Sequence, residues 1–278
     1  MLYMDALDSK GKMINKNPEA RTDASNGAQD RHFVAVVGKA LNLLGVFKGS
    51  ASELTNQELA EALDMPRSSV ARLTHTLTKL GYLESGHSKA SYKYGPSITR
   101  LALTALRDYS LSRRIRPLME EAAKSTGAAI SIGVRDGLDI FFLENVRGPS
   151  ALVLNIEAGG RIPIHNSSYG YAYLGSCSIQ ERANLVADIK KSGLLNDDEL
   201  EALIDKSAEQ LERLGYCLNI GQWHPDVSAI AIPVHRPNGN SPFIVGCGGS
   251  SSSLNEERLA LEVYPQLRTI ANALRESA

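Results

Sequence analysis

The sequence predicts an α+β protein in which a small helical domain ending in a hairpin precedes a larger domain of strands and helices. The chain has 278 residues, a length typical of about two domains. Its charge is unevenly divided, because residues 31–116 carry a net charge of +7 and residues 117–278 a net charge of −7. The hydrophobic spacing is helical up to Gly81, then changes to short strands, and is mixed beyond Leu111. A basic domain joined to an acidic one indicates two parts with different partners.

The composition narrows the class of protein. With 43% hydrophobic and 22% charged residues, the chain has the balance of a globular protein, not of a collagen-like or disulfide-rich one. Cys177, Cys217 and Cys247 are widely spaced and form no CxxC pair, so we expect neither a zinc site nor disulfides, as is typical of a cytoplasmic protein. No apolar run reaches the roughly 20 residues of a membrane span, and we expect no membrane partner.

The basic part of the chain is predicted to contain three helices. The first spans Phe33–Leu44, where apolar residues recur at helical spacing. The second begins at Thr55, whose hydroxyl is expected to cap the first turn in a capping box with Glu58. The third runs from about Pro66 to Leu80, because proline suits the first turn of a helix and Gly81 its end. The apolar residues expected on the inner face of the third helix are Val70, Leu73, Leu77 and Leu80.

Two short strands are predicted after the third helix. Residues 82–84 and 91–94 are joined by a polar loop, and a connecting helix is expected at 97–109. Helix, helix, turn, helix and hairpin in this order form a winged helix-turn-helix. In that motif the third helix packs one face on the core and offers its other face to the major groove of DNA.

The outer face of the third helix carries side chains that suit DNA recognition. Arginine pairs bidentately with guanine, serine and threonine contact bases or phosphates, and lysines of the hairpin contact phosphates. The candidate DNA-binding residues on the second helix, the third helix and the hairpin are Thr55, Asn56, Arg67, Ser68, Ser69, Arg72, His75, Thr76, Lys79, Lys89 and Lys93. The alternative is a small helical bundle whose basic face is simply solvated.

Beyond Leu111 the pattern predicts an α+β domain of about 160 residues. The expected elements, in chain order, are a helix at 112–125, strands at 129–134, 138–146 and 151–156, a mostly helical stretch at 168–214 broken near Gly193, strands at 228–235 and 242–247, and a helix at 255–277.

This second domain lacks the residue patterns of common catalytic sites. It contains no Gly-x-Ser-x-Gly, HExxH, GxGxxG or GxxxxGK[ST] motif. His165, His224 and His235 are well separated, and the acids at 197–199 are expected at a helix start, where carboxylates favour the helix dipole. We therefore expect a protein that is not an enzyme and that holds no metal and no cofactor.

A series of short motifs marks the helix-turn-helix segment. They are Lys39-Ala40-Leu41, Leu59-Ala60, Pro66-Arg67-Ser68-Ser69-Val70, Arg72-Leu73, Leu77, Leu80-Gly81-Tyr82-Leu83 and Tyr92-Lys93-Tyr94-Gly95-Pro96. Together they resemble the N-terminal domain of the IclR family of bacterial transcription regulators. The family usually has leucine where this chain has Tyr94, which is a tolerable apolar exchange.

The resemblance continues to about residue 275. Gly159-x-x-x-Pro163-x-His165, followed by Gly170 and Ala172, is similar to a signature segment of the family, and 215–216 and 229–234 match its later signature strands. The resemblance implies a C-terminal GAF-like α/β domain that binds a small metabolite. The expected organisation is a disordered tail at 1–30, a winged helix-turn-helix DNA-binding domain at 31–96, a linker helix at 97–110 and an effector-binding domain at 111–278.

The resemblance also implies which residues line the effector pocket. They are His165, Ser168, Tyr169, Gly170, Tyr171, Asn219, Trp223, Ala229, Gly246 and Gly248. Asn219 stands where family members often carry an acid, and Ala229 and Gly248 stand where some carry polar residues. Tyr171 replaces a common lysine. These departures imply a pocket unlike that of glyoxylate-type regulators.

The chemistry of this set suits a small aromatic or other organic acid, because it combines aromatic rings with hydrogen-bond donors. We expect Asn219 to donate a hydrogen bond to the acid. Gly246, Gly248 and Gly249 are expected to leave space and free backbone amides for an anion. The alternative is that the tyrosines pack in the core and the glycines serve turns.

The sequence thus predicts a DNA-binding transcriptional regulator whose operator affinity is modulated by a small organic acid, with aromatic acids among the candidates. A single recognition helix makes few contacts, so we expect a homodimer or a dimer of dimers on palindromic double-stranded DNA. Phe33, Val34, Val37 and the connecting helix are the candidates for the seam between subunits. The alternative is a metabolite-binding module or enzyme whose helix-turn-helix serves protein contacts.

Overall fold

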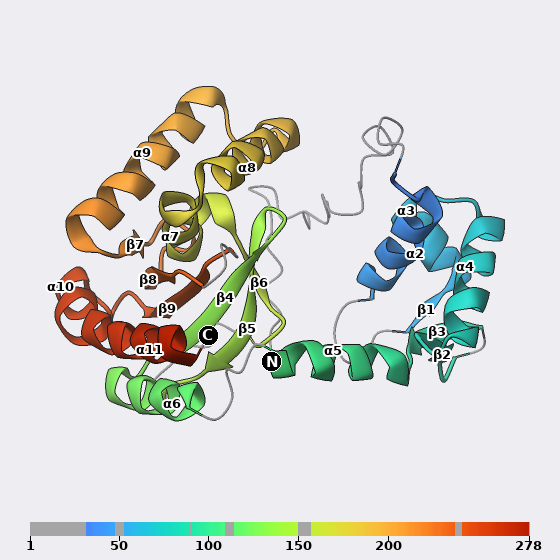
Figure 1. Ribbon diagram of the computed structural model, residues 1–278, viewed down its shortest axis with the longest axis horizontal. Helices are drawn as coiled ribbons and strands as arrows, with labels where there is room; N and C mark the ends of the chain where they lie inside the picture. The colour runs from blue at the N-terminus through green and yellow to red at the C-terminus, as the bar shows by residue number, and fades with distance from the viewer. Residues whose placement is uncertain are drawn as a thin grey trace. The chain divides into compact units, whose positions relative to one another are not determined.

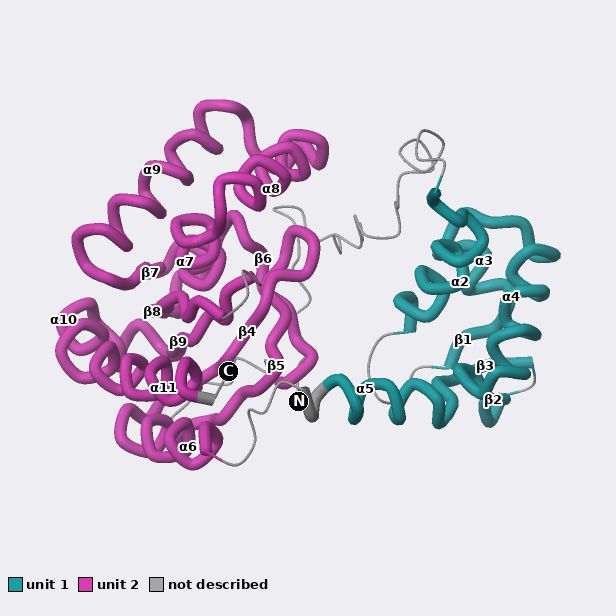
Figure 2. The backbone as a smooth tube through the Cα atoms, viewed as in Figure 1, with its two compact units in different colours: residues 1–108 teal, residues 109–278 magenta. Residues whose placement is uncertain are grey.

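The computed structural model describes residues 32–47, 53–88, 90–108, 114–149, 157–236 and 241–277. The chain forms two compact units, residues 1–108 and 109–278, which Figure 2 distinguishes by colour. The boundary falls within the segment expected to be the connecting helix. The expected tail at 1–30, the expected strand at 151–156 and Lys89 lie outside the described residues.

The first unit packs helices against a small antiparallel sheet (Figure 1). Its described elements are the helices α2 (Ala35–Gly45), α3 (Asn56–Leu63), α4 (Arg67–Lys79) and α5 (Pro96–Asp108) and the strands β1 (Leu54–Thr55), β2 (Leu83–Ser85) and β3 (Ser91–Tyr94), in the sheet order β1-β3-β2. Leu43, Leu59 and Val70 are fully buried in the shared core. The winged helix-turn-helix is therefore confirmed, with β1 as an unexpected third strand.

The inner face of α4 differs from the expected one at two positions. Leu80 is 60% exposed, so its expected place in the core is wrong, whereas Thr74 is fully buried. Each helical residue advances by about 100°, which places Thr74 about 40° from Val70 but Leu80 about 80° away. The buried position four residues after Val70 is therefore occupied by a polar residue, Thr74. Its hydroxyl donates a hydrogen bond to the Asn56 side-chain oxygen at 2.9 Å.

The second unit is built on a six-stranded antiparallel sheet with the order β6-β5-β4-β9-β8-β7. Its strands are β4 (Ala129–Asp136), β5 (Asp139–Val146), β6 (Arg161–Pro163), β7 (Cys217–Ile220), β8 (Val227–Val234) and β9 (Phe243–Ser250). The two edge strands β6 and β7 are short. The hydrophobic pattern did not predict either of them, although 215–216, which match a signature strand of the family, directly precede β7.

Helices cover both faces of this sheet (Figure 1). One face carries the 3-10 turn η2 (Ile164–Asn166) and the helices α7 (Ser168–Ser176), α8 (Ile179–Ser192) and α9 (Asp197–Leu214); the other carries α6 (Ile115–Thr126), α10 (Glu256–Arg258) and α11 (Tyr264–Ser277). The expected helical stretch at 168–214 breaks near Gly193, as predicted, and also at Ser178. Ser178 and Asn196 each close a capping box at the start of the next helix.

The expected final helix at 255–277 is interrupted. Residues Leu259–Val263 form a π-helical segment between α10 and α11. Pro265 lies just beyond this segment and has no backbone N–H, so it cannot donate the usual hydrogen bond to the carbonyl four residues earlier. The missing donor accounts for the wider turn.

The start of α7 lies unusually close to η2. A Cβ atom added at Gly170 would overlap the backbone carbonyl of Ile164, so only glycine allows this approach. At Gly248, by contrast, the nearest atom to an added Cβ would be the Ala229 methyl group at 3.8 Å, an ordinary contact.

We predict that Gly170→Ala lowers the free energy of unfolding of the second unit by about 1–3 kcal/mol, because backbone must move to relieve the overlap. Urea denaturation followed by circular dichroism measures the change. Gly248→Ala serves as the control and should leave stability within about 0.5 kcal/mol of wild type. Equal stability of the two variants would contradict the close packing described for Gly170.

Candidate functional site

The first candidate site is the solvent-exposed face of α4. Arg67, Ser68, Arg72, His75, Thr76 and Lys79 are exposed there, and Ser69 is half-buried. Pro66 caps the helix without a side-chain hydrogen bond. A helix anchored on one side by Val70 and Leu77 and basic on the other is the geometry required of a recognition helix.

Two expected DNA-binding residues have partners within the protein. The Thr55 hydroxyl accepts a hydrogen bond from the Glu58 N–H at 3.3 Å, which confirms the predicted capping box. The Asn56 side-chain oxygen accepts the bond from Thr74 and so ties the start of α3 to α4. The Thr55 side chain thus fixes the start of α3, and the Asn56 side chain holds α3 against α4.

A carboxylate organises the loop between β2 and β3. Glu53 accepts hydrogen bonds from the backbone N–H groups of His87 at 2.7 Å and Ser88 at 3.0 Å and from the Ser91 hydroxyl at 2.6 Å. These bonds, that of Ser91 foremost, hold the pKa of Glu53 well below its ordinary value of 4.5. The expected phosphate contact Lys93 pairs with Glu84 at 3.2 Å. Nothing in the sequence around Glu53 indicated its role, because its partners lie more than 30 residues away.

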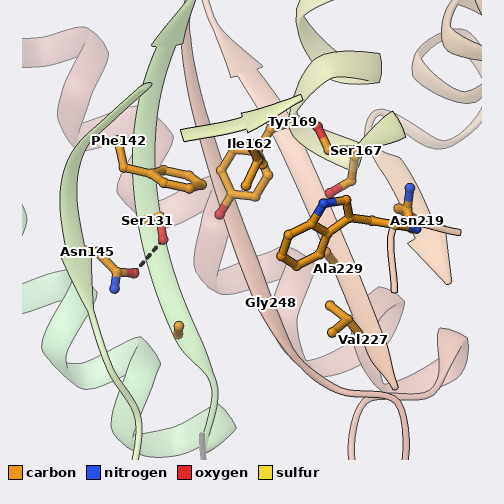
Figure 3. A pocket seen from close by; sticks show the side chains of 13 residues that line it. Ser131, Phe142, Asn145, Ile162, Ser167, Tyr169, Asn219, Val227, Ala229 and Gly248 are labelled. Atoms are coloured by element: carbon orange, nitrogen blue, oxygen red, sulfur yellow. Dashed lines mark hydrogen bonds between the residues drawn. The ribbon is translucent and has the colours of Figure 1, made fainter. Parts of the chain in front are cut away.

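The second candidate site is a pocket between α7 and the sheet (Figure 3), with about 530 Å³ of empty space when the solvent at its open mouth is included. Its lining residues come from the strands, the start of α7 and the connection from β7 to β8: Ala129, Ser131, Phe142, Asn145, Ile162, Ser167, Ser168, Tyr169, Asn219, Trp223, Val227, Ala229 and Gly248. None of them is charged.

The pocket contains part of the set expected from the sequence. Ser168, Tyr169, Asn219, Trp223, Ala229 and Gly248 line it, whereas His165, Gly170, Tyr171 and Gly246 do not. The missed residues are Ala129, Ser131, Phe142, Asn145, Ile162, Ser167 and Val227. Alternation along β4 places Ala129 and Ser131 on one face of the sheet, but only the strand order shows that this face meets the pocket.

The glycines of β9 have a different role from the expected one. Gly246 and Gly248 lie in a central strand that pairs with β4 on one side and β8 on the other. Their amides therefore belong to the sheet, and the expectation of free amides for an anion is wrong. A Cβ at Gly246 would lie 2.5 Å from the Tyr169 ring, so this glycine makes room for that ring.

The pocket has one polar end on β4 and β5. The Ser131 hydroxyl donates to the Asn145 side-chain oxygen at 2.6 Å, and Figure 3 shows this pair on the opposite side of the pocket from Ser167 and Asn219. Burial raises the pKa of the nearby Tyr169 hydroxyl, an effect that hydrogen bonding to Ser131 partly offsets. This end therefore offers neutral hydroxyl and amide groups.

The other polar end is the N-terminus of α7. Ser167 caps the helix, since its hydroxyl accepts from the Gly170 N–H at 3.1 Å and donates to the Pro163 carbonyl at 2.6 Å. The Ser168 hydroxyl is fully buried, and no described residue forms a hydrogen bond with it. A buried hydroxyl without a partner, next to the positive end of a helix dipole, is suited to an anionic group.

Asn219 lines the pocket, but its amide is occupied within the chain. Its side-chain nitrogen donates to the Asn166 carbonyl at 2.9 Å and to the Tyr171 hydroxyl at 3.4 Å. Its side-chain oxygen accepts from the backbone N–H groups of Gln222 at 3.2 Å and Trp223 at 3.1 Å. The amide therefore fixes the wall of the pocket and has no donor left for an acid.

Gly170 and Tyr171 support the site from outside the lining, through the packing against η2 and the bond with Asn219. Burial lowers the pKa of His165, which favours its neutral ring.

Among the described residues, no group of three His, Cys, Asp or Glu side chains could hold a metal ion. In the same part of the chain, no helix combines the length and the apolar character needed to cross a membrane.

A winged helix-turn-helix unit and a second unit with a pocket of aromatic, aliphatic and neutral polar walls are typical of a ligand-responsive DNA-binding protein. The chain matches the IclR helix-turn-helix domain over residues 36–86 and the IclR C-terminal domain of bacterial transcriptional regulators over residues 103–276. It therefore belongs to the IclR family and is a transcriptional regulator with an effector-binding domain. The family membership supports this function over a metabolite-binding module or enzyme that uses the helix-turn-helix for protein contacts.

Known proteins resemble the chain over most of its length. The HTH-type transcriptional regulator TsaQ1/TsaQ2 of Comamonas testosteroni is 29% identical over 257 residues, which cover 91% of this chain and 90% of that protein. An IclR family transcriptional regulator from Brucella abortus has 31% identity and a TM-score of 0.76, with 90% and 94% of the two chains covered. An IclR homologue from Microbacterium hydrocarbonoxydans in complex with 4-hydroxybenzoate has 19% identity and a TM-score of 0.68, with 87% and 98% covered.

We predict that replacing Arg67 or Arg72 with alanine weakens operator binding by about 1–3 kcal/mol, if that arginine reads a base. Lys89→Ala should weaken binding to operator and to random DNA about equally, because a phosphate contact is independent of sequence. Fluorescence anisotropy with a duplex selected from a random library measures both. Arg275→Ala, a change on α11 of the second unit, is the control. A selective loss of operator binding in Lys89→Ala would show that this lysine reads bases.

Proposed function

We propose that the pocket of the second unit binds a small aromatic carboxylic acid and that this effector changes the operator affinity of α4 in the cytoplasm. The observation that supports this proposal is the buried, unpartnered hydroxyl of Ser168, a residue that lines the pocket at the start of α7 beside aromatic and aliphatic walls. A carboxylate would accept hydrogen bonds from this hydroxyl and from the first amides of the helix, where the helix dipole favours negative charge.

The remaining walls suit a single aromatic ring. Phe142 and Tyr169 meet edge to face with their centroids 5.1 Å apart, and Trp223 and Ile162 complete the apolar lining. The Ser131–Asn145 pair at the opposite end provides a partner for a ring hydroxyl. The 4-hydroxybenzoate bound by the Microbacterium homologue is an acid of this kind and supports the proposal.

We predict that 4-hydroxybenzoate binds the wild-type protein and that the neutral analogue 4-hydroxybenzamide binds much more weakly. Ser168→Ala should weaken 4-hydroxybenzoate binding by about 1.5–3 kcal/mol, because it removes a hydrogen bond to a charged group. Isothermal titration calorimetry measures both affinities. Ser176→Ala is the matched control, since the Ser176 hydroxyl donates to the Ala172 carbonyl within the same helix. Equal binding of the acid and the amide would refute the carboxylate site.

We further propose that the protein binds its operator as a dimer. Phe33, Val34, Val36, Val37 and Leu41 are exposed apolar residues at and before α2, and Leu101 and Leu103 are exposed on α5. Apolar side chains grouped in this way on one unit favour contact with a second copy. Two recognition helices related by a two-fold axis would read a palindrome.

We predict that Leu41→Asp shifts the protein towards the monomer and weakens binding to a palindromic operator at least tenfold, because a charge cannot be buried in an apolar seam. Multi-angle light scattering at micromolar concentration measures the mass. Ile179→Asp, at an exposed position on α8, is the control and should leave the mass unchanged. A wild-type protein of 30.0 kDa that binds operator fully would contradict the dimer.

A further inference from the structure

The wall of the pocket formed by Trp223 belongs to a short connection between β7 and β8. Residues 221–226 link the two strands, and the turn begins at Gly221, whose φ is +67°. The Gly221 N–H donates to the Val227 carbonyl at 2.9 Å, which closes the connection at its base. Asn219 holds the near side of the connection through the backbone of Gln222 and Trp223.

A second set of bonds holds the Gln222 side chain. Its amide oxygen accepts from the Lys206 ammonium group at 2.7 Å and from the Tyr171 hydroxyl at 3.1 Å. The Lys206 nitrogen also lies 4.6 Å from the centroid of the Tyr171 ring. Lys206 lies on α9 and Tyr171 on α7, so hydrogen bonds from two helices hold the Gln222 side chain of the connection that carries Trp223.

Lys206 depends on this arrangement. Its side chain is half-buried, and burial lowers the pKa of its ammonium group. No described carboxylate forms an ion pair with it. The adjacent Cys217 thiol is buried with its pKa raised to about 12, so it is neutral at pH 7. The Gln222 oxygen and the face of the Tyr171 ring are therefore what offsets the loss of water around the cation.

We propose that Lys206 is a positioning residue for effector selectivity, which holds Gln222 and thereby fixes the distance of the Trp223 wall from the sheet. Lys206, Gln222 and Tyr171 do not line the pocket, so they act through Trp223 and not by touching the effector. Loss of the hydrogen bonds to Gln222 would let Trp223 move away from the sheet. The pocket would then lose its preference for a single ring, while the carboxylate end at Ser168 would be unchanged. The effect on effector selectivity rests on the proposed function, whereas the role of Lys206 in fixing Trp223 does not.

The chain offers a direct probe of this wall, because Trp223 is its only tryptophan. Lys206→Met keeps the aliphatic stem and removes the cation, whereas Lys206→Arg keeps a cation and tests for rescue. Lys190→Met is the matched control, since Lys190 lies on α8 and pairs with Asp197 at 2.7 Å on the surface. Gln222→Met removes the acceptor at an exposed position and decides the question if Lys206→Met does not fold.

The first measurement is acrylamide quenching of Trp223 without any ligand. We expect the quenching constant to rise by about twofold or more in Lys206→Met and Gln222→Met, and to stay near wild type in Lys206→Arg and Lys190→Met. An interaction of ~0.5–1 kcal/mol changes a local opening equilibrium by roughly this factor. Unchanged quenching in the folded Lys206→Met and Gln222→Met proteins would overturn the proposal.

The second measurement is titration with 4-hydroxybenzoate and with the two-ring acid 6-hydroxy-2-naphthoate. We expect the preference for the single ring to fall about threefold or more in Lys206→Met and to be restored in Lys206→Arg. A purely structural role would lower the melting temperature and leave this ratio unchanged, and that result would overturn the assignment of selectivity. If wild type binds neither acid, the proposed effector class fails, and the quenching measurement still decides whether Lys206 positions Trp223.

Discussion

The close approach of α7 to the turn η2 is the constraint on which the second unit depends. Gly170 lacks a Cβ, so the helix begins directly against the Ile164 carbonyl. Ser167 and Ser168, which precede Gly170, line the pocket, and the Tyr169 ring packs against Gly246. Two glycines, one in the helix and one in β9, thus shape a pocket that neither of them supplies with a functional group.

Polar contacts between distant segments play a similar part in the first unit. The apolar core holds α3 and α4 together, but the bond from Thr74 to Asn56 sets how the two helices meet. Glu53 accepts hydrogen bonds from the backbone N–H groups of His87 and Ser88 in the loop before β3. The basic residues of α4 are exposed, and the orientation of the helix depends on the buried residues of its opposite face, such as Val70 and Leu77. The basic face of α4 is therefore positioned by the neutral Thr74–Asn56 bond, and the loop before β3 by the Glu53 carboxylate.

The proposed effector site follows the same division of roles. The groups that face the pocket are neutral, so an anion there is met by a hydroxyl and a helix end, not by a counter-charge. Asn219 and Lys206 hold the Trp223 connection from either side.

The sequence by itself determined the local elements and the family. Helix periodicity and the cap at Thr55 depend on neighbours in the chain, so the winged helix-turn-helix was predictable, as were the strands that form β8 and β9. Only the tertiary structure decided that Leu80 faces solvent, that Asn219 is occupied within the chain, and that Ser131 faces the pocket. Helical geometry accounts for Leu80 once the structure shows that Val70 and Thr74 face the core. The other two depend on strand order or on a partner from a distant segment, and such contacts leave no periodic signal in the sequence.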